Sequence, residues 1–109
     1  MKNLTRHQVN EKIAGNGDKV ALVEVLSEEK FRDFHLPGAM NVPLGPKFDD
    51  QIQTVVPEKD TPVIVYCWDK DCEASSKAAA RLDELGYHEV YDYEAGKADW
   101  KAAGLPVET

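Results

Sequence analysis

Short apolar runs alternate with helix-forming segments along this chain, and this alternation constrains the fold more than any other feature. Residues 20–25 and 63–66 form nearly continuous apolar runs, which are typical of strands covered on both faces. Buried strands that are separated by helices usually pair in parallel. The sequence therefore predicts an α/β domain with a central, mainly parallel sheet between two helical layers.

Local patterns place the individual elements. Thr5 and Gln8 form a capping-box pattern at the start of a helix, while Phe48, Ile52 and Val55 recur at helical spacing. We expect helices over residues 5–14, 27–34, 48–55, 74–85 and 96–103, and strands over 20–25, 41–43, 63–66 and 89–91.

The composition fits one globular domain over residues 1–109, with 42% hydrophobic and 30% charged residues. A net charge of -7 argues against nucleic acid or an anionic membrane surface as a partner. No apolar stretch approaches the ~20 residues that span a bilayer, and the polar start is unlike a signal peptide. We therefore expect a cytoplasmic protein whose two cysteines are thiols rather than a structural disulfide.

Cys67 lies directly after the apolar run 63–66, and a helix is expected from Ala74. Ligand sites in parallel sheets lie beyond the carboxyl ends of the strands. The N–H groups of the loop and the helix dipole favour negative charge at such a place, which activates a thiol. We therefore expect Cys67 to be a reactive thiol in a cradle of loop N–H groups, and not an inert packing residue.

Several segments in this order resemble the rhodanese-like family of single-domain sulfurtransferases. They are Phe31 with 35–43 (HLPGAMNVP), 63–67 (VIVYC), Ala78, Ala79 and Leu82, 85–87 (LGY), Gly96 with Trp100, and 103–107 (AGLPV). The resemblance implies a three-layer domain with a mainly parallel, five-stranded sheet and helices on both faces. It also implies that Cys67 carries a persulfide, taking sulfur from a donor such as thiosulfate and passing it to cyanide or a thiol.

The chain departs from the family pattern around this site. Cys72 stands five positions after Cys67, where the family commonly has an arginine. The segment between Cys67 and the helix is longer than in the short-loop sulfurtransferases. Residues 24–26 (EVL) replace a frequent Asp-x-Arg, so a second basic residue near the site is missing.

The expected active-site loop is acidic. Its members beside the cysteines are Trp68, Asp69, Lys70, Asp71, Glu73, Ala74 and Ser75. Carboxylates disfavour a thiolate, so activation of Cys67 requires that they point into water. Lys70 is the only fixed positive charge of the loop, and it either binds an anionic sulfur donor or is solvated surface.

Other positions carry competing interpretations. Trp68 either packs under the loop or forms a wall of the pocket, and we favour the wall. Ser75 is interpreted as a helix N-cap, with a hydrogen bond to the Cys67 sulfur as the alternative. His35 is expected to fix a turn rather than to act as a base, and Glu24 could line a pocket at the same edge of the sheet.

Cys72 is either a small residue that fills the far side of the loop or a resolving thiol. A resolving thiol would attack a persulfide or sulfenate on Cys67 and form a disulfide. Two thiols with scattered histidines, His7, His35 and His88, do not form a zinc pattern, so we expect no metal and no cofactor.

The leading hypothesis is therefore a sulfurtransferase or sulfur carrier with Cys67 as the covalent nucleophile. Its partners would be a small sulfur-containing anion or a thiol, with a protein as a further candidate sulfur acceptor. Phosphatases and arsenate reductases of related fold use a loop arginine, which is absent between Cys67 and Arg81. The remaining alternative is a non-catalytic or redox-sensing rhodanese-like module that uses the Cys67/Cys72 pair.

Overall fold

Five parallel strands form the centre of the molecule, as the sequence predicts. The computed structural model describes residues 2–16 and 19–109. The strands are β1 (Lys2–Asn3), β2 (Ala21–Glu24), β3 (Met40–Asn41), β4 (Val63–Tyr66) and β5 (Val90–Tyr93). They lie in the order β1-β5-β4-β2-β3, and every neighbouring pair is parallel. The carboxyl ends of β2, β4 and β5 therefore lie along one edge of the sheet.

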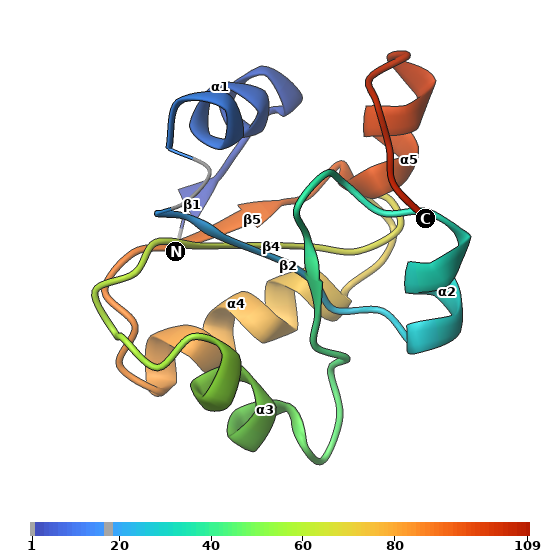
Figure 1. Ribbon diagram of the computed structural model, residues 1–109. Helices are drawn as coiled ribbons and strands as arrows, with labels where there is room; N and C mark the ends of the chain where they lie inside the picture. Colours follow the sequence, from blue (N-terminus) through green and yellow to red (C-terminus); the bar gives the residue numbers. More distant parts are fainter. Residues whose placement is uncertain (1, 17–18) are drawn as a thin grey trace.

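The helices cover both faces of this sheet, which confirms the predicted three layers. They are α1 (Arg6–Asn16), α2 (Glu28–Asp33), α3 (Phe48–Val55), α4 (Ala74–Glu84) and α5 (Gly96–Ala102). Figure 1 shows α3 and α4 on one face of the sheet and α1 and α5 on the other. No residue of α2 is buried, so this short helix connects the layers without forming a core of its own.

Each face of the sheet has its own apolar core, because successive strand residues point to opposite faces. The core under α3 and α4 includes Val23, Phe48, Ile52, Val65, Cys67, Ala78 and Leu82. The core under α1 and α5 includes Leu4, Val9, Leu22, Ile64, Tyr66, Tyr93 and Trp100. Strand β4 contributes to both cores and is fully buried, which fits its continuous apolar sequence.

The predicted capping box at α1 is present. The Thr5 N–H donates to Gln8 Oε1 at 2.9 Å, and the Gln8 N–H donates to Thr5 Oγ1 at 3.2 Å. The apolar pattern of the sequence does not predict β1. This strand has only two residues, both exposed, and it is defined by its pairing with β5.

The helix predicted from the spacing of Phe48, Ile52 and Val55 is confirmed as α3. Phe48 and Ile52 are buried against the sheet, but Val55 is 43% exposed. The chain leaves the helix at Val56, whose φ is -128°, and Val56 fills the inward position instead.

Within the described ranges, every helix is too short or too polar to cross a membrane.

Ile52 and Val55, a buried and an exposed apolar residue of α3, provide a test of this packing. We expect Ile52→Ala to lower the free energy of unfolding by about 2–5 kcal/mol, because it leaves a cavity under the sheet. Val55→Ala on the same helix should change it by no more than about 0.5 kcal/mol, since the side chain is exposed. Urea denaturation followed by circular dichroism measures both. Equal losses for the two variants would contradict the assigned face.

Candidate active site

Cys67 follows the last residue of β4, at the edge of the sheet where the strands end. Its side chain is fully buried and packs in the core beneath α4, in the same cluster as Ala78 and Ala79. The position after the strand is the predicted one. The burial means that its sulfur is closed to solvent in this state of the molecule.

The sulfur of Cys67 is bonded to the sulfur of Cys72. The two Cα atoms are 6.4 Å apart, within the range that a disulfide spans. This pairing corrects the expectation that both cysteines are thiols, because a loop of this length brings the two side chains together. Cys72 is partly exposed, in contrast to Cys67.

Hydrogen bonds within the loop, besides the disulfide, hold Cys72 in place. The Cys72 N–H donates to the Asp69 carbonyl at 3.1 Å, and the Asp71 N–H donates to Asp69 Oδ1 at 3.0 Å. These two amides therefore point at Asp69 rather than at a sulfur atom. Among the described residues no main-chain N–H donates to Cys67 Sγ, and the Cys72 carbonyl oxygen lies 3.3 Å from it. The predicted N–H cradle is therefore not formed while the disulfide is closed.

The first turn of α5 holds the other end of the loop. The N–H of Lys97 donates to the Cys67 carbonyl at 3.0 Å, and the N–H of Ala98 donates to the Trp68 carbonyl at 2.9 Å. Gly96 precedes them with a φ of +73°, and a Cβ built on it would lie 2.6 Å from the Trp68 carbonyl carbon. Only glycine permits this approach, because both the backbone angle and the space exclude a side chain.

Trp68 forms part of a small aromatic cluster next to Cys67. Its ring meets the ring of Phe34 edge to face, with centroids 5.5 Å apart, and the ammonium of Lys97 lies 5.0 Å from its centroid. The side chain is partly exposed, so it packs on one side and faces solvent on the other. Both interpretations of Trp68 thus describe part of its environment.

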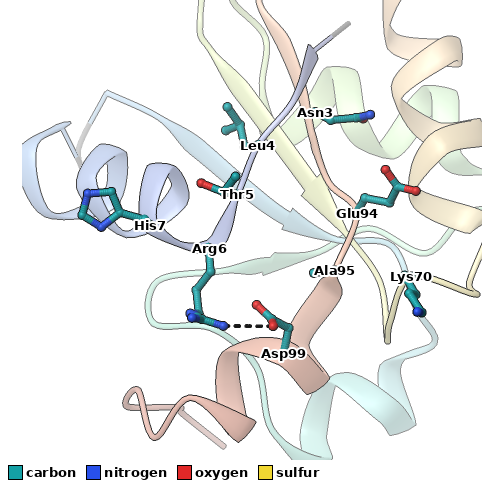
Figure 2. Close-up of a pocket in the computed structure, with 9 residues that line it drawn as sticks. All are labelled: Asn3, Leu4, Thr5, Arg6, His7, Lys70, Glu94, Ala95 and Asp99. Atoms are coloured by element: carbon teal, nitrogen blue, oxygen red, sulfur yellow. Dashed lines mark hydrogen bonds and ion pairs between the residues drawn. The ribbon is translucent and has the colours of Figure 1, made fainter.

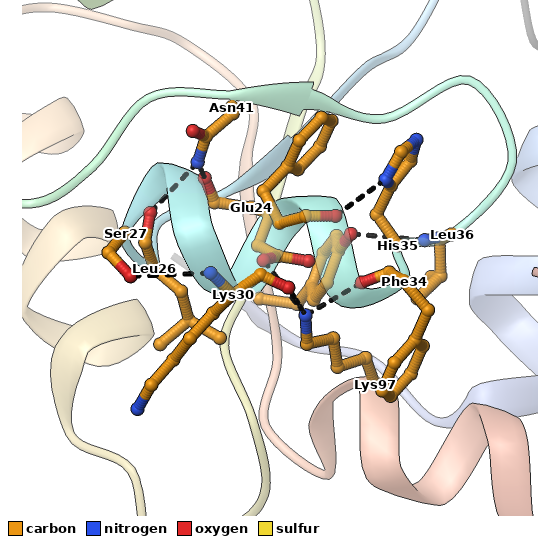
Figure 3. Close-up of polar contacts among 11 residues, drawn as sticks. Glu24, Leu26, Ser27, Lys30, Phe34, His35, Leu36, Asn41 and Lys97 are labelled. Atoms are coloured by element: carbon orange, nitrogen blue, oxygen red, sulfur yellow. Dashed lines mark hydrogen bonds and ion pairs between the residues drawn. The ribbon is translucent and has the colours of Figure 1, made fainter. Parts of the chain in front are cut away.

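A buried ion pair lies directly behind this cluster (Figure 3). Lys97 Nζ donates to Glu24 Oε2 at 3.0 Å, and both side chains are completely buried. The same ammonium donates to the carbonyls of Lys30 and Phe34, each at 2.7 Å. Its three protons all have acceptors, which is the arrangement that makes a buried charge tolerable.

Tyr66 is the neighbour of Glu24 in the sheet and shares its surroundings. Burial raises the pKa of the Glu24 carboxyl, and the ammonium of Lys97 opposes this effect. Burial and the Glu24 charge raise the pKa of the Tyr66 hydroxyl, which accepts a hydrogen bond from the Leu36 N–H at 3.2 Å. Glu24 therefore belongs to an internal network and lines no open pocket.

Helix α4 begins at Ala74, as predicted, but its N-cap differs from the predicted one. Glu73 holds the N-cap position and makes no side-chain cap hydrogen bond. Ser75 is therefore not the N-cap: it lies inside the first turn, is buried, and interacts with the carboxylate of Asp92. Its hydrogen bond to the Cys67 sulfur is likewise absent. The first-turn N–H groups of α4 thus lack a side-chain cap on the side of the two cysteines.

Asp92 is the second buried carboxylate, and it lies on β5 beside Val65 of β4. Burial raises its pKa, and the hydrogen bond with Ser75 opposes that shift. Its Oδ1 has no hydrogen-bond partner in the described part of the chain. The sequence offered one clue to Asp92, a charged residue inside an otherwise apolar strand.

Sequence patterns did not identify Lys97 as a buried residue of the site, because a lysine in the first turn of a helix is normally exposed to solvent. Only its place after Gly96, a residue of the rhodanese pattern, could have drawn attention to it.

Lys70 is exposed and lines a hollow of about 590 Å³. Figure 2 shows this hollow together with the ion pair between Arg6 of α1 and Asp99 of α5. Cys67 is not among its lining residues, so Lys70 and Cys67 do not share this hollow.

The loop carboxylates do not crowd the disulfide. Asp71 and Glu73 are exposed, and Glu73 faces Lys77 across 3.8 Å. Asp69 is partly exposed and caps the turn of the loop. Asp71 and Glu73 therefore meet the predicted condition for an activated thiol, that the carboxylates point into water, whereas the carboxylate of Asp69 turns back to the Asp71 N–H within the loop.

His35 fixes a turn, as expected. Its Nδ1 lies 2.9 Å from the Phe31 carbonyl oxygen, and its ring stacks on the Phe31 ring at 3.8 Å. Its backbone pairs with that of Glu108 in an isolated antiparallel bridge.

Comparison with known proteins identifies the family. Residues 5–103 match the rhodanese-like domain, so the chain belongs to this family. Thiosulfate sulfurtransferase GlpE of Actinobacillus succinogenes is 33% identical over 92 residues, covering 84% of this chain and 78% of that protein. The crystal structure of BH2092 from Bacillus halodurans has a TM-score of 0.87 at 25% identity and covers 98% of this chain and 76% of that chain.

Some relatives are much longer than this chain. The HTH-type transcriptional regulator Rv0324 of Mycobacterium tuberculosis is 30% identical over 90 residues, which cover 83% of this chain but only 38% of the regulator. The rhodanese-like domain is thus one part of that relative.

The contact at Gly96 can be tested against a second glycine with the same backbone geometry. Gly104 has a φ of +78° and open space around it, so Gly104→Ala should cost only the left-handed strain of about 1–2 kcal/mol. Gly96→Ala should cost about 1–3 kcal/mol more, because its Cβ overlaps the Trp68 backbone. Free energies of unfolding measure both variants. Losses of equal size would show that the α5 contact does not position the loop.

The buried ion pair makes a separate prediction. Lys97→Met should lower the free energy of unfolding by about 3–5 kcal/mol, because it leaves the Glu24 charge buried without its partner. The double variant Glu24→Leu/Lys97→Met should recover at least half of that loss, since it removes both charges. Lys77→Met is the control and should change stability by less than about 0.5 kcal/mol, because its ion pair with Glu73 is exposed. A double variant no more stable than Lys97→Met would contradict this account.

Proposed function

We propose that the chain is a sulfurtransferase or sulfur carrier whose sulfur-bearing residue is Cys67. The observation that carries the proposal is the position of Cys67 between the carboxyl end of β4 and the uncapped first turn of α4. Helix N-termini favour anions, so this place suits both a thiolate and a persulfide. The similarity to thiosulfate sulfurtransferases supports the same chemistry.

The first half of the proposed reaction loads sulfur onto Cys67. After reduction of the disulfide, the Cys67 thiolate attacks the outer sulfur of a thiosulfate-like donor. Sulfite leaves with the electron pair of the broken S–S bond, and Cys67 keeps the outer sulfur as a persulfide. The first-turn N–H groups of α4 are the donors available to an anion beside Cys67, because Lys70 lines a hollow that does not include this cysteine.

The proposal includes the partners and the location. The donor is a small anion with a transferable sulfur, and the final acceptor is a thiol, either of a small molecule or of a protein. A cytoplasmic location fits because thiol reductants there would open the disulfide.

A redox-sensing module is the second candidate, and the closed Cys67–Cys72 disulfide is the observation that favours it. In this role the pair would open and close with the redox state of its surroundings and transfer no sulfur. Burial of Cys67 in the closed form would then protect it from further oxidation.

Sulfite release distinguishes the two functions. Fully reduced wild type, freed of reductant and mixed with thiosulfate under anaerobic conditions, should release about one equivalent of sulfite per chain. Cys67→Ser should release none, because the attacking atom is gone. If the wild type also releases none while its disulfide still opens and closes in glutathione buffers, the redox-sensing function replaces the proposal.

A further inference from the structure

The pairing of the two cysteines suggests what happens to the sulfur after it reaches Cys67. We propose that Cys72 is the built-in second reactant of the site: it displaces the bound sulfur from Cys67 as hydrosulfide and closes the disulfide. This inference rests on the proposed function, because it requires a persulfide on Cys67. It adds a further activity, the release of free hydrosulfide by the chain itself.

Three features place Cys72 for this role. Its sulfur reaches the Cys67 sulfur across a Cα separation of 6.4 Å. Its backbone is held by the Asp69 carbonyl at 3.1 Å. The Cys67 side is held by the hydrogen bonds from Lys97 and Ala98. Both ends of the loop are thus fixed by contacts that do not involve sulfur, so the reduced loop keeps the two thiols close to each other.

The step balances without any further reagent. The Cys72 sulfur attacks Cys67 Sγ, forming the Cys67–Cys72 bond and breaking the bond from Cys67 Sγ to the outer sulfur. The outer sulfur leaves with that electron pair, takes the proton of the Cys72 thiol and departs as HS⁻. The two cysteines are oxidised to the disulfide, and the transferred sulfur is reduced to hydrosulfide.

The different exposure of the two cysteines determines which sulfur of the disulfide a reductant attacks. Cys67 is fully buried in the disulfide form, whereas Cys72 is partly exposed. A dithiol reductant therefore attacks the Cys72 sulfur, and Cys67 leaves as the thiolate. The sulfur of Cys67 must take up the next sulfur atom. Each reduction therefore returns Cys67 as a free thiolate, ready to react with the next donor.

The positions of the positively charged side chains also favour displacement of the sulfur by Cys72. A loop arginine would hold an anionic persulfide in place, but the one fixed cation in this loop, Lys70, lines a hollow that does not include Cys67. Of the two cations that α5 brings to the aromatic cluster, Lys97 donates to Glu24 and two carbonyls, and Lys101 lies over the Phe34 ring at 4.5 Å. Within the described part of the chain none of these three ammonium groups hydrogen-bonds to Cys67, whereas the thiol of Cys72 lies at its side.

The test follows sulfur, sulfite and protein mass together. Reduced protein, freed of reductant and kept anaerobic, is mixed with one equivalent of thiosulfate, and the products are compared for wild type, Cys72→Ser and Cys72→Ala. Wild type should release sulfite and hydrosulfide in equal amounts and end two hydrogen masses below the reduced chain. Both Cys72 variants should release sulfite, gain the mass of one sulfur atom, and release at most about a tenth as much hydrosulfide until a thiol is added.

The exposed variant Lys77→Ser, on the outer side of α4, is the control and should behave as wild type does. Wild type that keeps the added sulfur with Cys72 still open to alkylation would overturn the inference and leave the proposed function standing. Sulfite from wild type but from neither Cys72 variant would also overturn it, because Cys72 would then act in loading. Absence of sulfite from every variant would overturn the proposed function itself.

Discussion

The attachment of α5 to the backbone after β4 is the constraint on which the site depends. Cys67 is the first residue beyond the sheet, where no neighbouring strand fixes the chain further. The N–H groups of Lys97 and Ala98 take over at that point, binding the carbonyls of Cys67 and Trp68. Because Gly96 has no side chain, the helix can approach this backbone closely enough to do so. Main-chain contacts thereby fix the backbone at Cys67, while the core beneath α4 and the bond to Cys72 hold its side chain.

The same helix determines where the positive charge of the region goes. Lys97 turns inward, and its ammonium donates to Oε2 of the buried Glu24 and to two carbonyl groups. The inward orientation of Lys97 links β2, α2 and α5. It also removes a cation from the surface near Cys67. An anion at this site must therefore rely on the dipole and N–H groups of α4.

The sequence was sufficient for the fold and for the residue at its centre. The apolar runs identified β2 and β4, and the place of Cys67 after β4 followed from the order of the elements. The contacts that define the site could not be predicted from local sequence patterns. The Lys97–Glu24 pair joins residues 73 positions apart in the chain, so no local pattern records it.

Short-range details failed for a different reason. Ser75 has the side-chain chemistry of an N-cap, yet the N-cap position of α4 is Glu73, two residues earlier, and the Ser75 hydroxyl interacts with Asp92 instead. Helix boundaries are set by which side chains fit the core, and propensity alone does not decide them. The prediction of a main-chain N–H cradle around Cys67 was wrong for the disulfide form. With the two sulfurs joined, the N–H groups of Asp71 and Cys72 donate to Asp69 instead.

A cysteine at position 72 suits the space that the structure offers there. A thiol is small and packs against apolar side chains, whereas a guanidinium needs room and an anion beside it. Cys72 packs against the apolar core under α4 while it is bonded to Cys67. The chemistry that this position offers is therefore thiol–disulfide exchange with Cys67, and not the binding of an anion by a side-chain cation.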